Sequence, residues 1–214
     1  MKTAVILWTF IVPLLLLWWI FQRAAGLRGW IPTLVAGAAA LAATCFPWFG
    51  HPLPFWSASL SANFSVIMIA LLVLGILDRS GFPGVFRPRD WMAAWIFGAV
   101  ASSSLYPSAL GLGPQNFDSY ALGWPWLFWG QSLALFGGTG LAAALLIWRG
   151  NRFGYVLGLA LLGYAVGFQE SENLWDYLLD PVYGAVSLLV VLAVLARRFI
   201  SRSREGDPAG TTGR

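Results

Sequence analysis

The chain of 214 residues contains one cysteine, Cys45, and one histidine, His51. A lone cysteine excludes an intrachain disulfide and any zinc site built on paired cysteines. A lone histidine excludes the multi-histidine sites of zinc and di-iron membrane enzymes. We therefore expect neither a bound metal nor another cofactor.

Charge is also scarce, since Asp, Glu, Lys and Arg together make up only 10% of the residues. Soluble domains usually contain about 25%. The hydrophobic set AVILMFWYC makes up 58%, and several apolar runs approach the roughly 20 residues that cross a bilayer. This composition favours an integral membrane protein. The formal net charge of +4 comes from arginines at the ends of apolar runs, so it indicates membrane topology and not nucleic-acid binding.

Several catalytic motifs are missing from the sequence. It has no phosphate-binding GxxxxGK[ST], no dinucleotide-binding GxGxxG after a strand, no HExxH and no GxSxG. The only lysine is Lys2, so no lysine in the last apolar run can hold a retinal. These absences favour a non-catalytic protein or an enzyme that needs few polar groups.

Glycine, proline and charged residues divide the chain into apolar runs that we interpret as seven transmembrane spans. They cover residues 3–21, 31–49, 55–77, 91–110, 124–148, 153–169 and 181–200. We therefore predict an all-α fold, a polytopic transmembrane helix bundle formed by residues 1–200. Residues 201–214 are polar, without an apolar face, and we expect a disordered cytoplasmic tail there.

The arginines predict the orientation of this bundle. They fall in the first, third and fifth connections and after the last span: Arg23, Arg28, Arg79, Arg87, Arg89, Arg149, Arg152, Arg197, Arg198, Arg202, Arg204 and Arg214. The fourth and sixth connections contain Asp118, Glu170, Glu172, Asp176 and Asp180. By the positive-inside rule we expect the N-terminus outside and the C-terminus in the cytoplasm of a cell membrane, of the bacterial inner-membrane type. A cleaved signal peptide over residues 1–25 is the alternative, but it would export most loop arginines.

Polar residues in or near the predicted spans gather in the outer half of the bundle. The candidates are Asn63, Ser102, Ser103, Asn116, Asp118, Gln131, Gln169, Glu170, Asn173 and Asp176. Polar groups in lipid are costly, and they tend to face the bundle interior or a wet cavity. They predict either an outward-facing pocket or a set of caps and interhelical hydrogen bonds. Asp180 precedes Pro181 and is interpreted as a helix N-cap.

Small residues four positions apart predict close helix packing in lipid. The sixth span contains Gly154 with Gly158 and Gly163 with Gly167. The second span contains the series Ala36, Ala40 and Thr44. We expect these faces to contact neighbouring helices.

Three classes of function fit these observations. The first is a non-catalytic subunit or assembly factor, whose acidic outer face binds another membrane or extracytoplasmic protein. The second is a carrier or channel for a cation or small solute. The third is a lipid- or isoprenoid-modifying enzyme with Glu170 or Asp176 as general acid. Membrane lipids are expected partners in every case, and nucleic acid in none.

Overall fold

The computed structural model describes residues 3–60, 64–112, 118–125 and 131–205. The chain is all-α as predicted, 76% helical and without strands in this described part. The helices are α1 (Thr3–Ala24), α2 (Trp30–Cys45), α3 (Leu53–Leu60), α4 (Val66–Ser80), α5 (Pro88–Ala109), α6 (Gln131–Trp148), α7 (Phe153–Ala165), α8 (Leu174–Leu178) and α9 (Pro181–Glu205), with a 3₁₀ turn η1 (Tyr120–Gly123).

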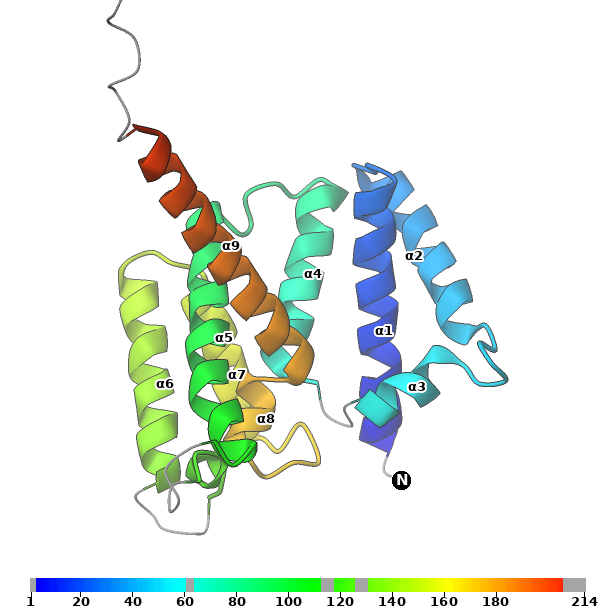
Figure 1. Cartoon of the computed structure of the whole chain (residues 1–214). Coiled ribbons are helices and arrows are strands. Elements are labelled where there is room, and N and C mark those ends of the chain that lie inside the picture. The colour runs from blue at the N-terminus through cyan, green and yellow to red at the C-terminus, as the bar shows by residue number, and fades with distance from the viewer. Residues whose placement is uncertain (1–2, 61–63, 113–117, 126–130, 206–214) are drawn as a thin grey trace, which may run out of the picture.

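The longer helices run up and down, so that similar loops gather at the same end (Figure 1). We call one end the arginine end: it holds the α1–α2, α4–α5 and α6–α7 connections and the end of α9, and it is uppermost in Figure 1. The opposite end holds η1, α8 and the loop of residues 166–173, and we call it the acidic end. The predicted segregation of arginine loops from acidic loops is therefore present in the fold.

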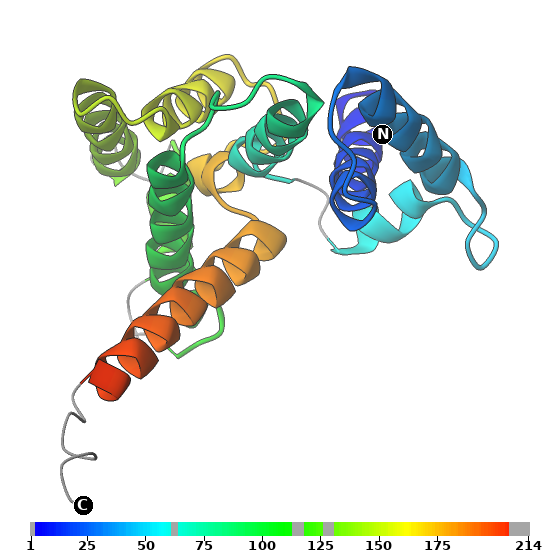
Figure 2. The ribbon, with the colours of Figure 1, turned by 90° about the horizontal axis from the view of Figure 1, so that it is seen from above.

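α5 and α9 make the most extensive contact between two described helices and lie against each other in both views (Figure 2). A Cβ built on Gly98 would lie 2.2 Å from Ser187 Oγ, and one on Gly184 would lie 2.5 Å from Ser102 Oγ. Glycine on each helix thus lets the two backbones approach, which is the packing mode expected in lipid. The sequence analysis did not assign close packing to this pair.

The small-residue faces predicted from the sequence are present only in part. Ala36, Ala40 and Thr44 are all buried on α2, as predicted. In the sixth span, a Cβ on Gly154 would lie 2.5 Å from the Ala143 carbonyl oxygen of α6. A Cβ on Gly158 would meet no atom within 4 Å, so the predicted packing at this glycine is wrong.

The third predicted span, residues 55–77, is not one helix. The chain forms the short α3 and then α4, which begins at Val66. The cause is local: the Ser65 hydroxyl accepts a hydrogen bond from Met68 N, a serine N-cap that starts a new helix. The sixth span is shorter than predicted as well, because α7 ends at Ala165 and Gly167 adopts φ 64°.

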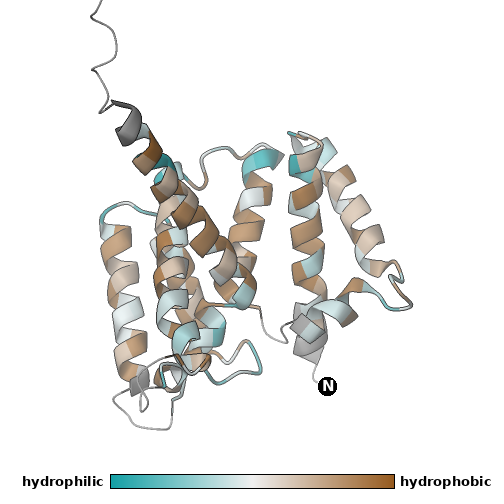
Figure 3. Ribbon diagram, viewed as in Figure 1, coloured by the Kyte–Doolittle hydropathy of each residue, from teal (hydrophilic) through white to brown (hydrophobic). Residues whose placement is uncertain are grey.

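Only one helical stretch in the described chain, Pro181–Ser201 of α9, is both long and apolar enough to cross a membrane. Four apolar stretches are shorter: Thr9–Ala24, Trp30–Cys45, Leu133–Trp148 and Phe153–Ala165. Hydrophobic residues lie mostly in the middle of the helices, and hydrophilic residues concentrate at their ends (Figure 3). The all-α fold is thus established, and the seven spans and their orientation stay predictions.

Candidate functional site at the acidic end

Asp180 joins two helices at the acidic end. Its Oδ1 accepts hydrogen bonds from Val182 N (3.0 Å) and Tyr183 N (2.9 Å), which confirms the predicted N-cap of α9. Its Oδ2 accepts from Ser65 N (3.1 Å) and Ser65 Oγ (2.6 Å), at the start of α4. The side chain is 1% exposed. Burial raises the pKa of Asp180, and the hydrogen bonds from Ser65, Tyr183 and Val182 oppose that shift.

Gln169 attaches the loop after α7 to the same region. Its Nε2 donates to the Phe64 carbonyl at 2.8 Å, and its backbone N donates to the Tyr177 hydroxyl at 3.0 Å. The residue is 6% exposed. Its Oε1 is buried and has no hydrogen-bond partner among the described residues.

Asn173 ties α8 to η1. Its Oδ1 accepts from Trp175 N (2.9 Å) as the N-cap of α8, and its Nδ2 donates to the Tyr120 carbonyl (3.0 Å). The Trp175 indole donates to the Ser119 carbonyl at 2.8 Å. The amide of Asn173 is fully buried, so its role is to hold two loops together.

Asp176 completes the network. Its carboxylate accepts hydrogen bonds from the Tyr120 hydroxyl (3.1 Å to Oδ2) and from the Ser171 hydroxyl. Burial raises the pKa of Asp176, and the Ser171 and Tyr120 hydrogen bonds oppose that shift. Burial and the adjacent Asp176 charge raise the pKa of Tyr120 to about 12. Tyr120 therefore stays protonated near neutral pH and donates to Asp176.

The predicted pocket residues are only partly brought together. Gln169, Glu170, Asn173 and Asp176 share one loop region, and η1 brings Asp118 near it. Glu170 and Asp118 are exposed.

Two predicted pocket residues lie elsewhere on α5. Ser102 is buried at the α5–α9 crossing and donates to the Gly98 carbonyl (2.7 Å), whereas Ser103 is exposed. Asn63 and Asn116 lie outside the described residues. Gln131 is the first residue of α6, and its side chain is also outside the description.

A cavity of about 530 Å³ opens beside this network. Glu170, Glu172, Gln169 and the rings of Tyr164 and Tyr177 contribute to its lining. The two rings meet edge to face with centroids 5.5 Å apart. No group of three His, Cys, Asp or Glu side chains that could hold a metal ion occurs in the described part of the chain. The cavity offers carboxylates and aromatic faces, groups that suit an organic cation.

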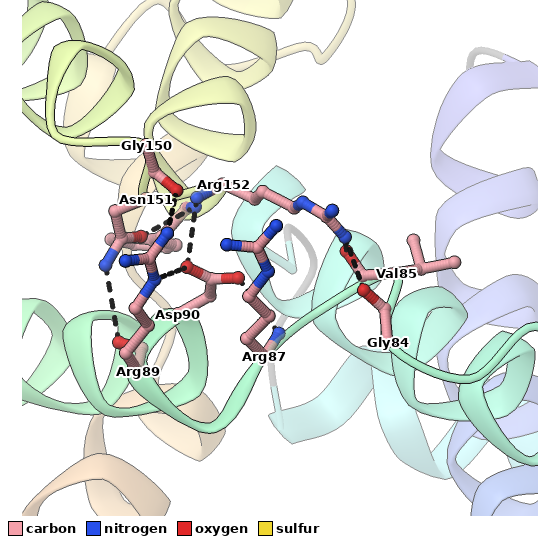
Figure 4. A network of polar contacts seen from close by, with 9 residues as sticks. Gly84, Val85, Arg87, Arg89, Asp90, Gly150, Asn151 and Arg152 are labelled. Carbon is pink, nitrogen blue, oxygen red and sulfur yellow. Dashed lines mark hydrogen bonds and ion pairs between the residues drawn. The ribbon is translucent and has the colours of Figure 1, made fainter.

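A second polar network lies at the arginine end, and the sequence analysis missed it (Figure 4). The buried Asp90 accepts from Arg87 N (2.9 Å) at the start of α5 and from Arg152 N (3.1 Å) at the start of α7. The Arg152 guanidinium donates to the Val85 carbonyl (2.7 Å), and the Arg89 guanidinium to the Gly150 carbonyl (2.6 Å). The sequence does contain a signal for the role of Asp90: it lies two positions after Pro88, and an acidic residue at this spacing is typical of a first helical turn.

Comparison with known proteins gives no match: no protein-family model, no curated protein and no solved structure proves similar to this chain. The functional argument therefore depends on the geometry alone.

Proposed function

We propose that the chain is a polytopic membrane protein, oriented with its arginine end in the cytoplasm, that acts as a non-catalytic subunit or assembly factor. Its acidic end binds a basic extracytoplasmic partner. One observation carries the proposal: Asn173, Asp176 and Asp180 are used in internal hydrogen bonds, while the carboxylates of Asp118, Glu170 and Glu172 stay at the surface.

The outer faces of the helices support a membrane location. Leu34 of α2 is 58% exposed, Leu141 of α6 62%, Leu159 of α7 50% and Leu189 of α9 68%. Soluble monomers rarely expose contiguous apolar patches of such extent. A bilayer would cover these faces, and the charged ends would then lie at its two surfaces.

The internal network argues for structure rather than chemistry. Asn173, Asp176 and Asp180 each hold two segments that are distant in the sequence. A general acid must reach its substrate. Asp176 instead faces Tyr120 and Ser171, which gives the enzyme hypothesis the least support of the three.

The exposed carboxylates favour a basic partner. Every described arginine side chain belongs to the arginine end, whereas Asp118, Glu170 and Glu172 are exposed at the acidic end. Complementary charge steers association and suppresses wrong partners.

Native mass spectrometry of the complex, extracted from its own membrane in mild detergent, tests this proposal. The triple variant Asp118→Asn, Glu170→Gln, Glu172→Gln should lose a stoichiometric partner while keeping its thermal stability. Asp78→Asn removes a carboxylate at the arginine end and should keep the partner. A protein that carries no partner, or a triple variant that retains it fully, contradicts the proposal.

A solute carrier is a second candidate, because the 530 Å³ cavity combines carboxylates with aromatic faces. Tetramethylammonium should then raise the Tm above the effect of sodium at equal ionic strength. The gain should vanish in Glu170→Gln with Glu172→Gln and persist in Asp118→Asn, which lies outside the cavity lining. An equal response to both cations would exclude such a site.

A further inference from the structure

A second cavity, of about 400 Å³, lies among α1, α4, α5 and α9. Its lining extends from Arg23 to Val182 and Tyr183, whose backbone N–H groups donate to Asp180. Leu16, Trp19 and Arg23 line it from α1, at a spacing that places them on one helix face. Val182, Val186 and Val190 line it from α9, also on one face. Figure 2 looks down on the bundle from the arginine end and shows α9 running away from α1, with α5 on the side of α9 that is turned away from α1.

Most of the residues that line the cavity are apolar. Leu71 and Leu72 of α4 and Trp91 and Trp95 of α5 contribute to the lining, and the two indole rings stack with centroids 5.8 Å apart. Such a lining suits a hydrocarbon chain, because water gains too few hydrogen-bond partners there.

The polar part of the lining is cationic. The Arg23 guanidinium lies 4.5 Å from the centroid of the Trp19 ring. Arg79 of α4 is close by, since its Nη1 donates to the Gln22 carbonyl at 3.5 Å. The one ion pair found in the described part of the chain joins Arg89 to Asp90, so neither Arg23 nor Arg79 has a carboxylate within 4.0 Å.

Arg23 and Arg79 repel each other, and Asp78, the carboxylate that acts on Arg23 electrostatically, forms no ion pair within 4.0 Å with either, so the two arginines favour a phosphate. The guanidinium group matches phosphate geometry and is weakly hydrated for a cation. Basic pockets between transmembrane helices on the cytoplasmic side bind anionic lipid head groups. A single ligand that satisfies both parts of this cavity has a phosphate at one end and an apolar chain at the other.

We propose that this cavity binds one anionic phospholipid, with its phosphate at Arg23 and Arg79 and an acyl chain between α1 and α9. The proposal rests on the membrane location but is independent of partner binding at the acidic end. The lipid would fill the space between α1 and α9 and hold these two helices together.

The test compares phosphatidylglycerol with phosphatidylcholine of the same chains, added to the delipidated protein in a neutral detergent. Native mass spectrometry measures bound lipid, and the Tm measures its effect. Phosphatidylglycerol should bind the wild type at one copy, and Arg23→Gln should weaken that binding by about fivefold or more. Arg28→Gln is the matched control: it removes an exposed arginine of the same loop, outside the cavity lining, and should bind like the wild type.

Val186→Trp fills the cavity while retaining both arginines, and it should also lose the lipid. Should this variant fail to fold, the pair Arg23→Gln and Arg28→Gln decides the matter. Equal binding of the two lipids, or equal loss in the two arginine variants, overturns the proposal. The same Tm gain from inorganic phosphate alone shows a free-anion site and overturns the lipid assignment. The triple variant at the acidic end should keep its phosphatidylglycerol, which separates this site from the proposed docking surface.

Discussion

Asp90 and Asp180 perform the same task at opposite ends of the bundle. In each buried carboxylate, one oxygen accepts a hydrogen bond from a backbone N–H group at the start of its own helix. The other oxygen accepts one from a backbone N–H group at the start of a neighbouring helix. Helix N-termini provide unpaired N–H groups and a partial positive charge, so two of them can stabilise one buried carboxylate. These two residues connect α5 with α7 and α9 with α4.

At the same scale, Asp176 should make stability depend on pH. Burial raises its folded pKa, whereas an unfolded aspartate has a pKa of about 3.9. The folded state thus binds the proton more tightly, and the free energy of unfolding falls as pH rises above about 4 until it passes the folded pKa. Burial raises the pKa of Asp180 in the same direction.

We therefore expect the wild-type Tm to decrease as the pH rises above about 4. The decrease should be smaller in Asp176→Asn, and Asp118→Asn, which changes an exposed carboxylate, should follow the wild type. Differential scanning fluorimetry in detergent measures all three. An identical decrease in Asp176→Asn and wild type would show that Asp176 is not protonated preferentially in the folded state.

Among the helices, the α5–α9 pair fits closely at two glycines. Gly98 and Gly184 face each other's helix so closely that a Cβ at either position would meet a serine oxygen at 2.5 Å or less. Gly158 on α7 has no atom within 4 Å of such a Cβ. Glycine is therefore required for close helix packing at Gly98 and Gly184, but not at Gly158.

Substitution by leucine measures this difference. Gly98→Leu and Gly184→Leu should each destabilise the protein by about 1–3 kcal/mol or more, since the added side chain forces the helices apart. Gly158→Leu should be nearly neutral by comparison. Yield of folded protein and Tm in detergent are the readouts. A severe loss in Gly158→Leu with none in Gly98→Leu would mean that α5 and α9 do not cross as described.

For the whole molecule, the separation of charge is the dominant feature. The Asp90 network fastens the α4–α5 loop to the α6–α7 loop, and Arg87, Arg89 and Arg152 lie in it (Figure 4). The acidic network fastens η1, α8 and the starts of α4 and α9 at the other end. For such a molecule in a membrane, the positive-inside rule favours the orientation in which the arginine end faces the cytoplasm.

Reporter fusions test that orientation. A reporter active only in the cytoplasm should work when fused after Arg89, Arg152 or Arg204 and should fail after Asp118 or Asp176. A reporter active only after export should give the opposite pattern at each site and serves as the control. Cytoplasmic activity at Asp176 or export at Arg204 would refute the seven-span orientation.

The all-α class, the gathering of the arginine-containing loops at one end, and the Asp180 cap could all be predicted from the sequence. Each depends on residues that are adjacent or on the order of loops along the chain. The break at Ser65 was missed, because the apolar run of residues 55–77 continues through it and the cap is completed by Asp180, 115 residues away.

Tertiary structure alone decided which polar side chains meet. Asp176 and Tyr120, Ser65 and Asp180, and Asp90 and Arg152 are distant in sequence. Composition and spacing show which residues share a helix end, but the rotation of each helix about its axis and its crossing angle are set by the packing of many side chains at once. For this reason Gly98 lies at the close contact between α5 and α9. Gly158 belongs to a GxxxG pattern on α7, but a Cβ there would contact no other atom.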